Sequence, residues 1–191
     1  MRVDAYTIYI DEFLKQIPLK GAIIDIACGP GNIAYYALKE RPDLRWIGLD
    51  GSVKMIEYAK SQNLNAEFKV QDCRTINPAP TIYSSAFCSF LLPYLNQEEV
   101  KGLLKSIYIG LKDEGQLYLS TTLEAGAKRD ASQNESRQPE YHSEYHIKQW
   151  LIEAGYKISS SHILVNALNG DTELILLTKK MSRIERDVKQ T

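Results

Sequence analysis

The chain has 191 residues, of which 44% are hydrophobic and 25% are charged, and its net charge is −1. This length allows one domain with a substantial core rather than two, and the weak net charge provides no general field that would attract nucleic acid. Its three cysteines are unclustered, and no apolar run approaches the ~20 residues that span a bilayer, so we expect a cytoplasmic protein without disulfide bonds, a metal site or a membrane segment.

The first half of the chain alternates apolar runs with helical patterns, which is typical of a parallel sheet whose strands are connected by helices. An amphipathic helix is expected first, over residues 3–16. The expected strands are 22–27, 45–50, 66–72 and 81–91, and the expected helices between them are 32–40 and 52–62. Ser52 suits the N-cap of the second of these helices, because its hydroxyl can accept a backbone hydrogen bond.

The second half opens with a helix whose first turn carries Asn96 and Glu99 at the spacing of a capping box. Apolar residues recur along this helix every three or four positions, which predicts a buried stripe. The stripe consists of Val100, Leu103, Leu104, Ile107 and Leu111. A fifth strand is expected at 116–122.

The segment 122–143 is rich in polar and charged residues, so we expect a mobile surface loop or lid there. The helix that follows ends at Gly155, the expected C′ residue. Two further strands, 157–167 and 172–179, are joined by LNGD, whose Asn-Gly pair favours a tight antiparallel hairpin. For the charged tail, 181–191, we expect no specific function.

A glycine-rich turn follows the first predicted strand, where residues 24–32 read IDIACGPGN. Such a turn lets a ligand approach the backbone closely. From Gly29 the letters GPGNIA satisfy the dinucleotide fingerprint G-x-G-x-x-[GA], yet Asp25 lies in the preceding apolar run, where that fingerprint asks for no acid. The motif alone therefore leaves a nicotinamide cofactor and another nucleoside ligand as alternatives.

Polar side chains or bare backbone follow each of the first four predicted strands. In an open α/β sheet, ligands bind beyond the carboxyl ends of the strands, near the point where the strand order reverses. The loops that would form such a site are 25–32, 50–52, 71–74 and 90–94.

These features together resemble the class I S-adenosylmethionine-dependent methyltransferases. The resemblance depends on D-x-A-C-G-P-G at 25–31, on Asp50 at the end of the second strand, on Q-D-C-R at 71–74 and on the final hairpin. It runs from about residue 18 to residue 180 and includes the pattern LPYL at 92–95 that small bacterial members share. One departure is Ala27, where the family often has glycine.

The resemblance implies a Rossmann-like three-layer α/β/α sandwich. Its sheet would have seven mostly parallel strands in the order 3214576, with the final strand antiparallel. It also implies one methyltransferase domain over residues 1–180, within which 122–143 is a variable loop or lid.

The resemblance further implies S-adenosyl-L-methionine as cofactor and S-adenosyl-L-homocysteine as product. Asp25 would hold the ammonium of the methionine tail, and the helix start at Asn32 would favour its carboxylate. Asp50 would accept the ribose hydroxyls, while Asp72 would meet the adenine amino group and the Cys73 amide a ring nitrogen. The other expected cofactor residues are Ala27, Cys28, Gly29, Pro30, Gly31, Gly51, Ser52, Met55, Arg74, Phe90 and Leu91. For Arg74, a solvated loop position remains an alternative, and Cys28 and Cys73 are expected to be small fillers rather than reactive thiols.

Methyl transfer from a sulfonium needs alignment more than a base, so a general base is optional. The candidates for one, should the acceptor need it, are Tyr94, Tyr141, His142 and His146, although either histidine could simply be solvated. Signatures of base or glutamine methylation are absent, which favours a small-molecule acceptor over nucleic acid. A cofactor-binding partner without catalysis and, less favoured, a nicotinamide oxidoreductase are the alternatives. The oligomeric state is not predicted.

Overall fold

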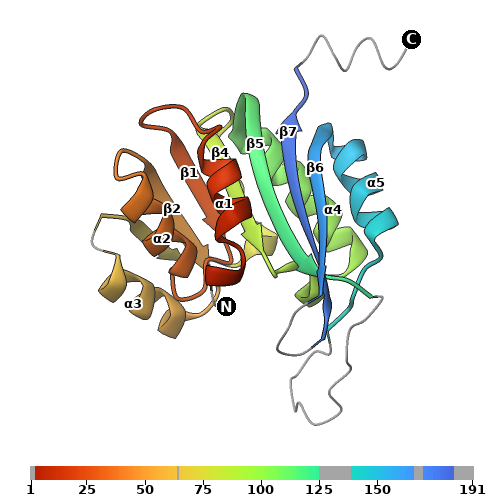
Figure 1. Ribbon diagram of the computed structural model, residues 1–191, viewed down its shortest axis with the longest axis horizontal. Helices are drawn as coiled ribbons and strands as arrows, with labels where there is room; N and C mark the ends of the chain where they lie inside the picture. Colours follow the sequence, from red (N-terminus) through yellow and green to blue (C-terminus); the bar gives the residue numbers. More distant parts are fainter. Residues whose placement is uncertain (1–2, 64, 125–138, 166–169, 183–191) are drawn as a thin grey trace.

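The computed structural model describes residues 3–63, 65–124, 139–165 and 170–182 (Figure 1). The strands are β1 (Ala22–Ile26), β2 (Arg45–Asp50), β3 (Glu67–Val70), β4 (Tyr83–Ser89), β5 (Leu111–Thr122), β6 (Tyr156–Val165) and β7 (Thr172–Lys180). The α-helices are α1 (Thr7–Leu14), α2 (Asn32–Glu40), α3 (Val53–Gln62), α4 (Gln97–Gly110) and α5 (Glu144–Ala154). Short 3-10 helices are η1 (Val3–Ala5), η2 (Cys73–Thr75) and η3 (Leu92–Tyr94).

The strands form one sheet in the order β3-β2-β1-β4-β5-β7-β6, which confirms the expected order 3214576. Strands β1 to β5 pair in parallel, and β7 runs antiparallel to both β5 and β6, as the hairpin prediction requires. The chain leaves β1 toward β2 on one side and returns to β4 on the other. The strand order therefore reverses between β1 and β4, which is where an open sheet of this kind offers a ligand crevice.

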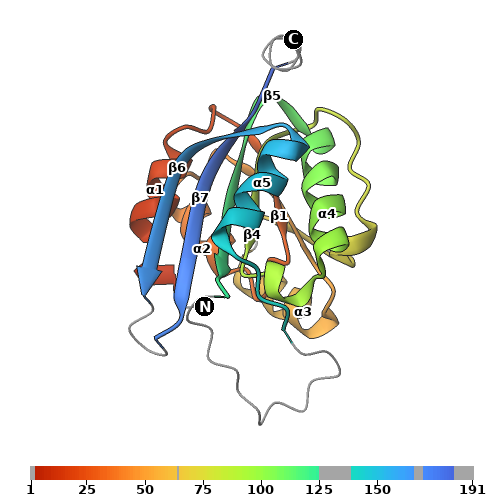
Figure 2. The ribbon, with the colours of Figure 1, turned by 90° about the vertical axis from the view of Figure 1, so that its right-hand side faces the viewer.

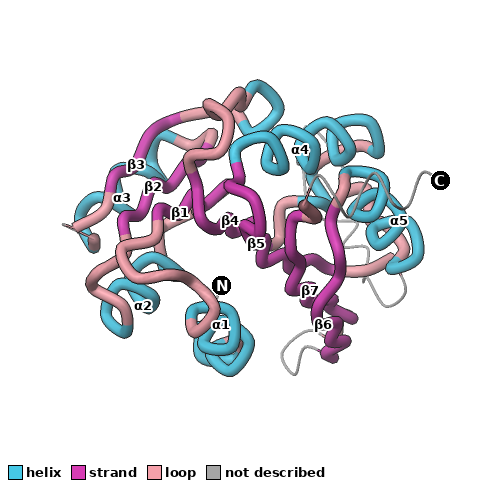
Figure 3. Tube along the Cα trace, turned by 90° about the horizontal axis from the view of Figure 1, so that it is seen from above, coloured by secondary structure: helices cyan, strands magenta, loops and turns pink. Residues whose placement is uncertain are grey.

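Helices cover both faces of the sheet, which gives the expected three layers (Figures 2 and 3). Apolar residues of α4 and α5 pack in one core cluster, and those of α1, α2 and α3 pack in a second cluster on the opposite face. Phe87 and Tyr118, on the central strands, are almost fully buried against Phe13 of α1. No helix in the described ranges is long and apolar enough to cross a membrane.

Three local signals predicted from sequence are confirmed at the helix ends. The Ser52 hydroxyl accepts a hydrogen bond from the Met55 amide, 3.4 Å away, and so caps α3. At the start of α4, the Glu99 amide donates to Asn96 Oδ1 and the Asn96 amide donates to Glu99 Oε2, which completes the capping box. Gly155 ends α5 in the left-handed conformation, with φ of 99°.

The junction between α4 and β5 differs from the expectation. Leu111 is fully buried as predicted, but it begins β5 rather than ending the helical stripe. The regular pairing of β5 with β4 starts at Gln116, after an irregularity around Glu114, whose φ is 63°. The predicted strand 116–122 thus corresponds to the regular part, and the extension before it was missed because LKDEG reads as a polar turn.

The polar segment 122–143 is only partly described. Leu123 and His142, at its two ends, are buried and form a parallel β-bridge, so these ends belong to the packed structure rather than to a surface loop. The predicted mobile loop falls mainly on 125–138, which lies outside the described residues. The same holds for the first half of the LNGD turn, at 168–169, and for the tail from 183 onward.

Candidate functional site

A pocket of about 1010 Å³ opens at the carboxyl ends of β1, β2, β3 and β4. It lies at the reversal point of the strand order, where the sequence analysis placed a ligand site. Most of the predicted cofactor residues line it: Ala27, Gly29, Pro30, Asp50, Gly51, Ser52, Met55, Asp72, Cys73, Arg74, Phe90 and Leu91. Tyr94, one of the candidate bases, also lines it.

The two glycines of the loop after β1 have different tasks. Both have positive φ, 54° at Gly29 and 78° at Gly31. A Cβ on Gly31 would lie 2.7 Å from Asn63 Nδ2, so this glycine allows the loop to pack against α3 and does not line the pocket. A Cβ on Gly29 would meet nothing within 4 Å, so the Gly29 backbone borders open space that a ligand can enter.

Asp25 lies on β1 and is only 1% exposed, so it does not line the pocket directly. Its Oδ2 atom makes no hydrogen bond to any described residue. Burial raises the pKa of Asp25 to about 8, the negative charge of Asp50 acts in the same direction, and the Trp46 side chain opposes the shift. A buried acid whose Oδ2 has no hydrogen-bond partner among the described residues can respond to a positive charge bound at this loop.

Asp50 ties two loops of the pocket together. Its Oδ2 accepts a hydrogen bond from the Gly29 amide at 2.9 Å, and its Oδ1 accepts one from the Ser52 amide at 2.8 Å. A carboxylate has about four acceptor sites, so each oxygen can accept a further hydrogen bond from a ligand. This arrangement suits a pair of neighbouring hydroxyl groups.

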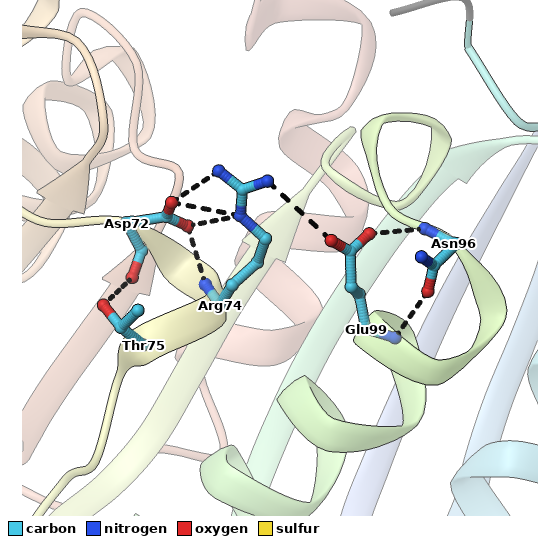
Figure 4. Close-up of polar contacts among 5 residues, drawn as sticks. All are labelled: Asp72, Arg74, Thr75, Asn96 and Glu99. Atoms are coloured by element: carbon cyan, nitrogen blue, oxygen red, sulfur yellow. Dashed lines mark hydrogen bonds and ion pairs between the residues drawn. The ribbon is translucent and has the colours of Figure 1, made fainter.

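Asp72 and Arg74 form a close ion pair at the far wall of the pocket, beyond β3 (Figure 4). The Asp72 carboxylate accepts hydrogen bonds from the Arg74 amide, Nε and Nη2. These contacts lower the pKa of Asp72 to about 2. The carboxylate is therefore ionised at neutral pH and offers only acceptors to a ligand.

The loop after β4 forms the wall between the pocket and β5. Phe90 has a φ of 55°, a strained conformation for a residue with a side chain, and its amide donates to the Ser120 carbonyl at 2.7 Å. Ser89 and Val70 also line the pocket, although they lie outside the predicted site loops. Gln71 lines it within the predicted loop 71–74, but it was not among the expected cofactor residues. Ser89 could have been suspected, because it is a polar residue at the carboxyl end of an apolar strand, and its buried hydroxyl has no described partner.

The four candidate bases are placed differently. Tyr94 is 54% exposed and lines the pocket. Tyr141 does not line it; it follows Glu140, whose amide donates a hydrogen bond to the Pro93 carbonyl. His142 is buried instead, with Nε2 at 2.9 Å from the Leu95 carbonyl and its ring against Trp150. His146 stacks on the same tryptophan. Neither histidine lines the pocket, and their catalytic role remains a prediction that this placement does not favour.

The two other predicted cofactor residues, Cys28 and Asn32, do not line the pocket. Asn32 begins α2, whose N-terminal end follows the glycine loop. Burial raises the pKa of the Cys28 and Cys88 thiols well above their usual range, and that of Cys73 to about 11, so all three are protonated at neutral pH and poor nucleophiles. Among the described residues, no group of three His, Cys, Asp or Glu side chains could hold a metal ion.

Comparison with protein families gives one match that covers the pocket loops. The family described as a methyltransferase domain matches residues 23–115. Among curated proteins, trans-aconitate 2-methyltransferase of Methylobacterium radiotolerans is 36% identical over 85 residues. That match covers 42% of this chain and 33% of the relative, so the similar region spans about a third of the relative's length.

Solved structures match over nearly the whole chain. A SAM-dependent methyltransferase from Methanosarcina mazei superimposes with a TM-score of 0.75 at 18% identity, over 91% of this chain and 97% of its own. Geranyl diphosphate C-methyltransferase from Streptomyces coelicolor, solved with Mg²⁺, geranyl diphosphate and S-adenosyl-L-homocysteine, gives 0.77 at 12% identity, over 94% and 79%. At such identities, these structures establish the shared fold.

Proposed function

The chain belongs to the class I S-adenosylmethionine-dependent methyltransferases, and from this premise we propose that it transfers a methyl group from S-adenosyl-L-methionine to a small-molecule acceptor. The observation that carries the proposal is the pocket itself. Open backbone at Gly29 and two carboxylates, Asp50 and Asp72, follow three neighbouring strands and line one pocket. The family match covers all three of these loops.

The residues present fit this cofactor. The open space over Gly29 leaves room for a ligand tail, and the unpartnered Oδ2 of Asp25 beneath it suits an ammonium, held directly or through water. The N-terminal end of α2 favours a carboxylate. Asp50 has free acceptor capacity on both oxygens for the ribose hydroxyls, and each such hydrogen bond to a charged group contributes roughly 1.5–3 kcal/mol.

The bound cofactor would supply a sulfonium, which makes its methyl group electrophilic. The protein then has to exclude water and hold an acceptor in line with the S–CH3 bond, and such alignment lowers the barrier by about 7–11 kcal/mol in favourable cases. Phe90, Leu91 and Tyr94 form the wall beside which an acceptor would lie. Tyr94 and the neighbouring Tyr141 are the groups best placed to accept or relay a proton, if the acceptor atom carries one.

We also propose that residues 1–180 form a single catalytic domain, that 181–191 is a charged extension, and that the protein works in the cytoplasm. The three cysteines are all unpaired thiols, as in a reducing compartment. A small-molecule acceptor is supported by the weak net charge and by the aromatic wall of the pocket.

The two alternative functions are a cofactor-binding partner without catalysis and a nicotinamide oxidoreductase. A cofactor-binding partner without catalysis would share the pocket and its affinity for S-adenosylhomocysteine but would turn over no acceptor. A nicotinamide oxidoreductase is disfavoured by Pro30 inside the glycine turn and by the acid at Asp25, a position where the dinucleotide fingerprint requires no acid.

Calorimetric titration of the purified protein with S-adenosyl-L-homocysteine and, in parallel, with NAD is the decisive first test. We expect micromolar binding of the former and none of the latter. Binding of NAD alone would refute the proposal. When S-adenosylhomocysteine binds, formation of this product from S-adenosylmethionine across a panel of small acceptors then separates an enzyme from a non-catalytic partner.

A further inference from the structure

We propose that Arg74 and Glu99 are positioning residues that hold the Asp72 carboxylate for the 6-amino group of adenine, so that the pocket selects adenine over hypoxanthine nucleosides. This inference rests on the proposed function. It adds Arg74 and Glu99, which would not touch the ligand but would orient Asp72. Figure 4 shows the row that these side chains form, from the loop after β3 to the first turn of α4.

Arg74 fixes both oxygens of Asp72. Oδ1 accepts hydrogen bonds from the Arg74 amide and Nε, each at 2.9 Å, and Oδ2 accepts from Nε at 3.0 Å and from Nη2 at 2.5 Å. A guanidinium is planar and matches a carboxylate with two parallel hydrogen bonds, so it sets the plane of the carboxylate as well as its charge. A free aspartate side chain on a loop would have several rotamers instead.

Glu99 holds the other end of the guanidinium. Its Oε1 lies 3.8 Å from Arg74 Nη1, on the side of Arg74 that faces away from Asp72. Oε2 of the same carboxylate accepts from the Asn96 amide at 2.8 Å, within the capping box of α4. Arg74, which is half exposed, is thus anchored to a helix end rather than left to move with its loop.

The base of a bound nucleoside would lie against Asp72 for a geometric reason. Asp50 and Asp72 follow adjacent strands, and Asp50 is paired with Val70, two residues before Asp72. A ribose held by Asp50 has the glycine loop on its β1 side, where the methionine tail is accommodated. The base is therefore directed toward β3, between the apolar side chains of Met55 and Leu91 and next to Asp72.

An ionised Asp72 recognises a donor and rejects an acceptor. Arg74 keeps the carboxylate charged, and a carboxylate in that state has lone pairs but no hydrogen to donate. Adenine presents an amino group at position 6, whereas hypoxanthine presents a carbonyl oxygen that would face the carboxylate without a hydrogen bond. A site that pairs with a polar group discriminates strongly against an analogue that lacks it.

The test measures the binding of two ligands to each variant by calorimetry. The ligands are S-adenosyl-L-homocysteine and S-inosyl-L-homocysteine, its deaminated analogue with a 6-oxo group. The variants are Arg74→Gln, Arg74→Lys and Glu99→Gln, with Asp72→Asn as a reference for loss of the carboxylate. Glutamine is compatible with a capping box, so Glu99→Gln removes the charge beside Arg74 and keeps the helix start. Glu98→Gln makes the same change one residue away, on an exposed side chain, and is the matched control.

We expect wild type to prefer the adenine ligand by about tenfold or more, the effect of one hydrogen bond to a charged group. Asp72→Asn should abolish this preference, because an amide can pair with either ligand. Arg74→Gln should reduce it several-fold, chiefly by weakening the adenine ligand, and Arg74→Lys should restore part of it. Glu99→Gln should reduce it about two- to fivefold, as for a partly exposed ion pair, while Glu98→Gln leaves it unchanged.

Three results would overturn the inference. One is an Arg74→Gln variant that weakens both ligands equally, since a purely structural role in the loop would do that. Another is a wild-type protein that binds S-adenosylhomocysteine without preferring it, which leaves the proposed function standing and removes the recognition of the amino group. The last is wild type that binds neither ligand, which refutes the proposed function and this inference with it.

Discussion

Asp50 has two tasks in the pocket, because the same carboxylate accepts two backbone amides and offers its remaining lone pairs to a ligand. Asp50→Ala should weaken binding of S-adenosyl-L-homocysteine at least about tenfold, since two hydrogen bonds to a charged group are lost. Calorimetry measures the affinity, and circular dichroism checks that the variant is folded. Asp50→Asn keeps one acceptor oxygen, so its affinity for S-adenosyl-L-homocysteine should lie between those of wild type and Asp50→Ala. Near-normal affinity of Asp50→Ala would contradict the ribose assignment.

Ala27 adopts a conformation that costs free energy for any residue with a Cβ. Its φ is 55°, and the left-handed region costs such a residue roughly 1–2 kcal/mol. Glycine avoids this cost but loses about 0.5–1 kcal/mol more in chain entropy on folding. Ala27→Gly should therefore raise the free energy of unfolding by about 0.5–1 kcal/mol in urea titrations. Ala34→Gly, within α2, should lower it by about 1 kcal/mol, and equal effects of the two changes would refute the strain argument.

The backbone strain at Ala27 could not be predicted from the sequence, which shows an alanine where glycine would have signalled a positive φ. His142 illustrates a second limit. It lies in a polar segment that predicts exposure, yet Leu95 and Trp150, distant in sequence, enclose it. By contrast, the acids Asp50 and Asp72 could be placed at the pocket, because each is the last residue of a predicted strand.

Replacement by alanine should change the free energy of unfolding in opposite directions at two glycines, one at the end of α5 and one within α4. Gly155 has a φ of 99°, and a Cβ there would lie 2.8 Å from Tyr108 Cε2, so Gly155→Ala should lower the free energy of unfolding by about 1–2 kcal/mol or more. Gly102 is exposed within α4, and a Cβ there would meet nothing within 4 Å. Gly102→Ala should raise the free energy of unfolding by about 0.5–1 kcal/mol. Thermal and urea unfolding of both variants measure the contrast, and a stabilised Gly155→Ala would exclude the left-handed cap.

The starts of α3 and α4 could be predicted to the residue, whereas the first helix, expected over 3–16, covers only Thr7–Leu14, and the end of α4 was missed. Ser52 and the Asn96–Glu99 pair carry side chains that satisfy backbone amides locally, so their signal needs no tertiary context. At Leu111, the hydrophobic period of α4 continues although the helix stops, because the residue is buried equally well as the first residue of β5. Hydrophobic spacing alone does not distinguish these two outcomes.

At the scale of the whole molecule, the strand order and the position of the pocket could be predicted from the sequence. The contacts of the residues that support the pocket, such as Arg74, Glu99 and Ser89, could not. Alternating elements and the Asn-Gly hairpin indicate a mostly parallel sheet, and the family resemblance supplies its order. The Arg74–Glu99 contact joins the short segment after β3 to the first turn of α4, and the unpartnered hydroxyl of Ser89 depends on what packs around it. Only the packed structure determines such contacts.

Asp25 links the pocket to the stability of the whole molecule. Its pKa is raised from 3.8 to about 8, chiefly by burial, so the folded state holds a proton that the unfolded chain releases above pH 4. Its stabilising contribution is therefore complete below pH 3.8 and is lost as the pH rises toward 8, at about 1.4 kcal/mol per unit. The free energy of unfolding should fall over this range by up to several kcal/mol on account of this group alone.

Asp25→Asn replaces the acid with a neutral side chain of the same shape, which removes the titration. Urea unfolding between pH 5 and pH 8.5 should show a smaller loss of stability in this variant than in wild type, with the two curves converging toward the acidic end. Glu57→Gln, on the exposed side of α3, is the matched change of charge and should run parallel to wild type. Parallel curves for Asp25→Asn and wild type would contradict a raised pKa of Asp25 in the folded state.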